Sequence, residues 1–204
     1  MSEPNLRAAV SWLLAAACAA AAGCASDIRP DDFMQGGPLT GELTPTGPVT
    51  TIANADGTFS TLVDATSDKT WTHVDFADGT EAVDTGPWEL RFQRFHISAN
   101  GGITGSAGVE VAEIAGRAFD ELGGVPSAAW ISDAPDGDDA NTTPDYAFEQ
   151  GEGWYNYNFE RHVLTPRAVV WVVRSSDGAI KLRIERYYDA AGTPGWIALR
   201  WKPL

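Results

Sequence analysis

AVVWVVRSSDGAIKLRIE, residues 168–185, is the stretch that decides the predicted fold class. The β-branched and aromatic run up to Val173 is typical of a buried strand, and the SSDG that follows is a turn signal. From Ile180 onward, apolar side chains alternate with charged ones, which gives the second strand one dry face and one wet face. The pattern therefore predicts an antiparallel β-hairpin.

Other short apolar alternations, separated by turn signals, extend this pattern along the chain. The only helical spacing lies at Val111 to Leu122, and Gly116 weakens it. The sequence thus predicts an all-β fold, a single antiparallel β domain with at most one short helix. The expected strands are Phe59 to Val63, Trp71 to Phe76, Trp88 to Ile97 and Trp196 to Lys202.

The expected strand Trp88 to Ile97 contains a histidine near its end. Alternation puts His96 on the same side as Trp88, but the apolar side switches near Arg94. A β-bulge at Arg94 would turn His96 outward, whereas an unbroken strand would keep it on the Trp88 side. The sequence leaves both possibilities open.

The N-terminus predicts an export signal over residues 1–23. Its apolar run, from Ala8 to Ala22, is shorter than the roughly 20 residues that span a bilayer. The tetrapeptide that ends at Cys24 resembles a bacterial lipobox, with Cys18 as a weaker site and an ordinary secretory signal as the alternative. We expect Cys24 to carry a lipid that is the only membrane anchor. Ala25 then favours the outer membrane, on its cell-surface or periplasmic side.

Residues 24–50 are rich in Pro, Gly and Thr, which predicts a flexible tether. Residues 51–204 are then one β domain with a single core. After signal cleavage and acylation no free cysteine pair remains, so the core must be stable without a disulfide.

The chain carries 28 acidic and 14 basic side chains, a formal net charge of -14, which disfavours nucleic acid as a partner. Asp136, Asp138 and Asp139 could chelate calcium, although their spacing fits no EF-hand loop and a solvated loop is the simpler interpretation. The three histidines lie far apart, and no nucleophile-base or zinc-ligand spacing is present. The sequence therefore does not predict an enzyme.

Aromatic residues crowd the segment from Tyr146 to Phe159. On any strand there, Tyr155 and Tyr157 share one face, while Trp154 lies on the other beside two asparagines. Core packing explains one face, and the other is free for a flat macrocycle or a sugar ring.

The order of these pieces resembles the HmuY-like family of bacterial haem-binding lipoproteins from about residue 58 to the end. Its most specific parts are the W-E-L-x-F-x-R strand followed by N-G-G, and the late V-R-S-x-D-G-x-x-K-L hairpin. The matching stretches are WTHVDFADGTEAV (71–83), PWELRFQRFHISANGGITGSAGV (87–109), GWYNYNFERHVLTP (153–166) and VVWVVRSSDGAIKLRIERYYDAAGTPGWIALRWKPL (169–204).

The resemblance implies a non-enzymatic protein that binds haem for iron acquisition and passes it to an outer-membrane receptor. Family members hold the iron with two axial His or Met side chains, and here no Met follows Met34. His162 is the best candidate ligand and His96 the second, with a tyrosinate from Tyr155 or Tyr157 as a possible partner. The alternative is an HmuY-like surface module without haem that binds a glycan or a protein partner, a glycan through Trp154.

Overall fold

The computed structural model describes residues 43–137 and 142–204, so the signal peptide, Cys24 and most of the predicted tether lie outside it. Every strand pair in this part of the chain is antiparallel, as the all-β prediction requires. No helix within the described residues is long and apolar enough to cross a bilayer.

The larger sheet has six strands in the order β1-β2-β12-β11-β10-β7. The predicted hairpin is confirmed as β10 and β11, and the predicted final strand as β12, which lies between β11 and β2. The strands are β1 (Val49–Ala53), β2 (Phe59–Asp64), β7 (Glu110–Ile114), β10 (Val170–Ser175), β11 (Gly178–Tyr188) and β12 (Pro194–Pro203).

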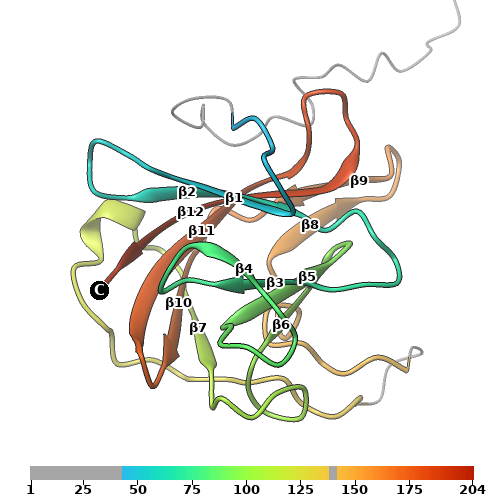
Figure 1. Cartoon of the computed structure of the whole chain (residues 1–204). Coiled ribbons are helices and arrows are strands. Elements are labelled where there is room, and N and C mark those ends of the chain that lie inside the picture. The colour runs from blue at the N-terminus through green and yellow to red at the C-terminus, as the bar shows by residue number, and fades with distance from the viewer. Residues whose placement is uncertain (1–42, 138–141) are drawn as a thin grey trace, which may run out of the picture.

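A four-stranded sheet, green in Figure 1, has the order β4-β3-β5-β6. One buried core joins it to the larger sheet, with Val74 and Phe92 on one side and Val63, Leu182 and Leu199 on the other. Two sheets that share one hydrophobic core form a two-layer β domain. The strands are β3 (Thr72–Asp75), β4 (Thr80–Ala82), β5 (Leu90–Gln93) and β6 (His96–Ala99).

A third, two-stranded sheet is the hairpin of β8 (Tyr155–Asn158) and β9 (Val163–Pro166). Trp154, directly before β8, is fully buried in the shared core. The hairpin therefore starts in the core, while Tyr157 and Phe159 farther along are 41% and 80% exposed.

The helical candidate at Val111 to Leu122 forms no α-helix, which agrees with the prediction of at most one short helix. Its first half is β7, which pairs with β10, and its second half holds only η2, a 3-10 turn at Phe119–Glu121. Gly116 separates them with a φ of 71°. Because β7 completes the edge of the larger sheet, strand pairing outweighs the helical spacing of the alanines.

The single expected strand Trp88 to Ile97 is wrong, because it is the hairpin of β5 and β6. Gln93 pairs with His96 across a two-residue turn, and Arg94 has a φ of 53°. A positive φ at the first central residue is typical of a type II′ hairpin turn. The chain reversal explains why the apolar side of the sequence switches at Arg94.

The glycine-rich loop after β6 packs closely against the loop around Asp133. A Cβ at Gly102, whose φ is +66°, would lie 1.9 Å from the Asp133 carbonyl oxygen. The glycines are thus explained by backbone conformation and close approach.

Candidate functional site

A cavity of about 780 Å³ lies beside β6, the segment 143–151 and the start of β8. Its aromatic walls are Phe95, Tyr146 and Tyr155, and its polar groups include His96 and Glu149. Concave sites of roughly 300–1,000 Å³ with aromatic walls and a few convergent polar groups are typical of ligand pockets. This cavity is therefore the candidate functional site.

His96 is held in a fixed orientation within this cavity. Its Nδ1 lies 3.0 Å from Glu149 Oε1 and 3.2 Å from Oε2. The ring of Phe95 lies 4.1 Å away on centroids and that of Tyr146 5.3 Å away. His96 and Glu149 each keep 22% of their side-chain surface exposed. His96 is thus positioned, yet open to the cavity.

The second ring nitrogen of His96 is available to a ligand. Among the described residues, Nε2 of His96 makes no hydrogen bond, since Nδ1 makes both contacts to Glu149. A carboxylate at Nδ1 fixes a proton on that nitrogen and leaves the Nε2 lone pair free. Metal-ligating histidines are oriented by this kind of carboxylate contact. The arrangement can therefore donate one imidazole nitrogen to a metal.

The β5–β6 turn brings His96 to this position. The turn is tied to the core because Trp154 Nε1 donates a hydrogen bond of 3.0 Å to the Phe95 carbonyl. Arg94 N also donates to the Ala65 carbonyl at 2.7 Å. These two hydrogen bonds hold both residues of the turn, Arg94 and Phe95. The sequence left open a β-bulge at Arg94 or an unbroken strand, and the structure has neither, because the chain reverses there.

Two tyrosines form neutral walls of the cavity. Burial raises the pKa of Tyr146, and burial followed by the charge of Glu149 raises the pKa of Tyr155. A raised pKa keeps each phenol protonated at neutral pH. Tyr155 therefore offers a ring face and a hydroxyl, and it would ligate as a tyrosinate only by losing its proton to a bound metal.

Asp133, which is 2% exposed, connects segments that line the cavity without lining it itself. Its carboxylate accepts hydrogen bonds from Ser98 Oγ at 2.7 Å, from Thr104 Oγ1 at 2.5 Å and from Ala147 N at 2.8 Å. Ala147 follows Tyr146 in the chain, and Ser98 lies on β6 with His96. Asp133 thus joins the two segments that carry the cavity wall.

His162, the candidate preferred on sequence, lies at the exposed turn of the β8–β9 hairpin. Its φ is 55°, and its Nδ1 lies 2.8 Å from the Tyr157 hydroxyl. Tyr157 in turn packs edge-on against Phe159. The structure brings Tyr155 together with His96, and Tyr157 together with His162, and no contact joins the two histidines among the described residues.

Other sequence candidates lie away from this cavity. His73, on β3, is buried, and burial lowers its pKa although its Nε2 lies 3.2 Å from Asp84. Trp154 is fully buried, so the expectation that it stacks on a sugar is wrong. No cluster of three or more His, Cys, Asp or Glu ligands occurs within residues 43–137 and 142–204, and two of the aspartates proposed for calcium lie outside that part.

Sequence reasoning did not identify Glu149 or Asp133 as site residues. Glu149 meets His96 across 53 positions, and Asp133 meets Ser98 across 35. Contacts at such separations leave no local periodicity or spacing, so no motif could have pointed to them. The one usable signal was the change of apolar side at Arg94, which marks the turn.

Comparison with known proteins finds solved structures with a similar fold. The solved structures that resemble this chain include a protein of Bacteroides fragilis described as a lipoprotein, one of Bacteroides vulgatus described as HmuY-like and heme-binding, and the apo HmuY analog of Tannerella forsythia. The first is 20% identical, with a TM-score of 0.57, and the match covers 74% of this chain and 93% of that one. The second is 17% identical, with a TM-score of 0.57 and coverages of 71% and 91%. The third is 16% identical, with a TM-score of 0.55 and coverages of 74% and 95%.

At these identities the structural likeness establishes the fold. No curated protein matches the chain. The family model described as HmuY protein matches residues 67–201, which include the whole β5–β6 turn, the cavity and both candidate histidines. The chain therefore belongs to the HmuY family.

Proposed function

We propose that this protein binds haem without catalysing a reaction, in the cavity that holds His96. The observation that carries the proposal is the geometry of His96, whose Nδ1 is bound to Glu149 while Nε2 is open to an aromatic cavity of about 780 Å³. Burying the faces of a porphyrin between aromatic rings is favourable in itself. A neutral, oriented imidazole supplies an axial iron ligand.

His96 replaces His162 as the first candidate for the iron ligand. The two candidates differ in surroundings, because His96 lies against the rings of Phe95 and Tyr146 whereas His162 lies at an exposed turn. The β8–β9 hairpin links the two sites, since Tyr155 lines the cavity and Tyr157 holds His162. We infer a single histidine ligand, with a tyrosine hydroxyl or no protein group opposite.

Hemin titration followed by the Soret band tests the proposal. We expect the purified protein to shift the band, His96→Ala to abolish the shift and His162→Ala to leave it in place, since each variant is the matched control of the other. An unshifted band at micromolar protein would remove the haem proposal. Loss of the shift in His162→Ala alone would move the ligand to the hairpin turn.

Glu149→Gln separates orientation from ligation. The amide can still accept from Nδ1 but carries no charge, so we expect haem affinity to fall by about 10- to 100-fold while the Soret position changes little. Unchanged affinity in this variant would mean that Glu149 has no part in holding the ligand.

We further infer that the protein acts at the cell envelope, anchored by a lipid on Cys24, and passes haem to an outer-membrane receptor. The lipobox-like sequence and the likeness to a Bacteroides fragilis protein described as a lipoprotein support this location. Metabolic labelling with a fatty acid should mark the wild-type chain. A Cys24→Ala variant that is still labelled would contradict the anchor.

A further inference from the structure

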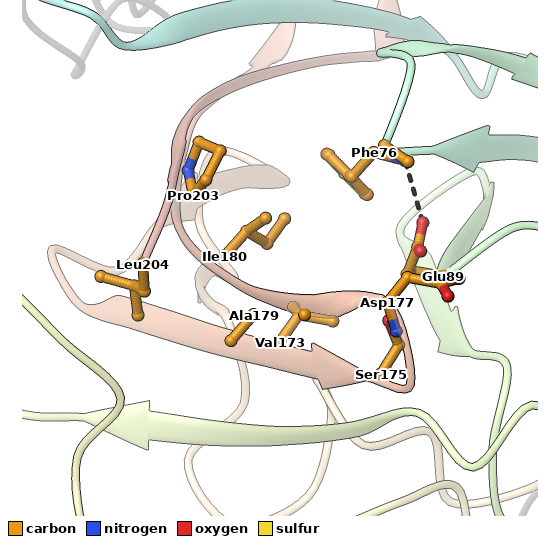
Figure 2. A pocket seen from close by; sticks show the side chains of 11 residues that line it. Phe76, Glu89, Val173, Ser175, Asp177, Ala179, Ile180, Pro203 and Leu204 are labelled. Atoms are coloured by element: carbon orange, nitrogen blue, oxygen red, sulfur yellow. Dashed lines mark hydrogen bonds between the residues drawn. The ribbon is translucent and has the colours of Figure 1, made fainter.

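A second cavity, of about 210 Å³, lies at the other end of β5 from His96. It is enclosed by the β3–β4 turn, the β10–β11 turn and the last residues of β12. Figure 2 shows side chains from all three segments pointing toward one hollow. It shares no lining residue with the His96 cavity.

The walls of this cavity are apolar and its charges are all negative. Phe76, Val173 and Ile180 line it together with two carboxylates, Glu89 and Asp177. Asp177 is exposed at the β10–β11 turn, whereas Glu89 is 9% exposed. No Lys, Arg or His of the described residues lines the cavity. The cavity therefore has an acidic group inside and another at its edge, with no positive charge to balance them.

The buried carboxylate of Glu89 has hydrogen-bond donors but no cation beside it among the described residues. Its Oε2 accepts a hydrogen bond of 2.9 Å from Phe76 N, drawn as a dashed line in Figure 2. No Lys, Arg or His forms an ion pair with Glu89 within the described part of the chain. Burial, followed by the charges of Asp75 and Asp177, raises the pKa of Glu89 against the effect of hydrogen bonds from the backbone amides of Phe76 and of Glu89 itself. A desolvated carboxylate of this kind gains most from a cation brought by a ligand.

We propose that this cavity binds an alkylammonium group, with Glu89 as its counterion and Asp177 at the entrance. The volume corresponds to about seven waters of ~30 Å³ each, which accommodates a chain of four carbons and a nitrogen. The apolar walls favour such a group over a bare metal ion, which would need several oxygen ligands at once. The same chemistry occurs in a free amine and in a lysine side chain.

NMR titration of the ¹⁵N-labelled protein with n-butylammonium tests this site. We expect saturable shifts at the amides of Phe76 and Ile180, and at least tenfold weaker binding of n-butanol, which has the same length and no charge. Glu89→Gln should weaken n-butylammonium binding at least tenfold, because the amide can still accept from Phe76 N but offers no charge. Equal binding of the alcohol and the amine, or an undiminished affinity in Glu89→Gln, would overturn the proposal.

Glu81→Gln is the matched control for general attraction to an acidic protein. Glu81 is an exposed carboxylate on β4, so its loss should leave amine binding unchanged. A loss of affinity equal to that of Glu89→Gln would attribute the binding to net charge and refute a specific site. Titration with N-acetyl-lysine methylamide then distinguishes a lysine side chain from a free amine as the source of the alkylammonium group. Binding as tight as that of n-butylammonium points to a lysine of a polypeptide. Weaker binding points to a free amine. Neither result depends on haem, whose titration should be the same in Glu89→Gln and wild type.

Discussion

Asp133 is the buried carboxylate that holds the wall of the His96 cavity together. Its carboxylate accepts from two hydroxyls and two backbone amides, so Asp133→Asn replaces one acceptor oxygen with a donor that faces other donors. We expect a loss of about 1–3 kcal/mol in the free energy of unfolding. Urea denaturation measures this loss in the free energy of unfolding. The control variant Asp136→Asn, at an exposed position of the same loop, should stay within about 0.5 kcal/mol of wild type. Equal effects of the two variants would contradict the role given to Asp133.

Single residues were predicted only where their neighbours in sequence define their role. Tyr155 and Tyr157 share a face of β8 because alternation requires it, and that could be predicted. The pairing of His96 with Glu149 depends on a chain reversal at Arg94 and on the conformation of the segment 143–151. The sequence of that segment does not predict its conformation. His162 was preferred because it is the sole histidine of the second half of the chain, a criterion that carries no information about burial.

At the scale of elements, η2 is attached to the larger sheet by the buried Lys181 and by Arg200, whose Nη2 lies 3.2 Å from Asp120 Oδ1. Lys181, on β11, is 5% exposed, and its Nζ donates to the carbonyls of Phe119 at 2.6 Å and Leu122 at 2.7 Å. Lys181→Met keeps the length of the side chain and leaves both carbonyls without their donor. We expect a loss of about 1–3 kcal/mol and faster hydrogen exchange in the segment that contains η2.

Lys69→Met, at an exposed position, is the control and should change neither quantity. Unchanged exchange around η2 in Lys181→Met would show that the apolar contacts of Phe119 and Leu122 with Val170 and Val172 are sufficient to hold it.

Elements with strict alternation could be predicted and elements at points of chain reversal could not. β11 and the end of β12 alternate apolar with charged side chains, β10 begins with a continuous apolar run, and all three predicted strands are confirmed. Val111 to Leu122 is a helical candidate because its alanines favour helices. The stretch instead contains most of the short strand β7, which forms because it pairs with β10, a tertiary contact that local sequence does not encode. Trp88 to Ile97 misled because a two-residue turn without glycine, asparagine or proline lacks the usual turn signal.

For the molecule as a whole, Glu89 makes stability depend on pH. Its folded pKa lies above the ordinary value of 4.5, so the folded state binds the proton more tightly than the unfolded state. Stability from this group is therefore greatest below 4.5 and declines as pH rises through 4.5 and the raised folded pKa. Unfolding measured in urea from pH 4 to 8 should show that Glu89→Gln removes this part of the decline.

Glu81→Gln, on an exposed carboxylate, should keep the wild-type pH profile. A Glu89→Gln profile parallel to that of wild type would contradict the assignment of this decline to Glu89.

The placement of β12 has a consequence for how the protein is made. β12 lies between β2 and β11, so the edge of β2 that faces the centre of the sheet has no partner until the last residues of the chain arrive. We therefore expect a chain emerging from a ribosome or a secretion pore to lack stable tertiary structure until β12 is present, and then to fold in one late step. Chains stalled before Pro194 should be rapidly digested by protease, whereas chains that contain all of β12, through Pro203, should resist it.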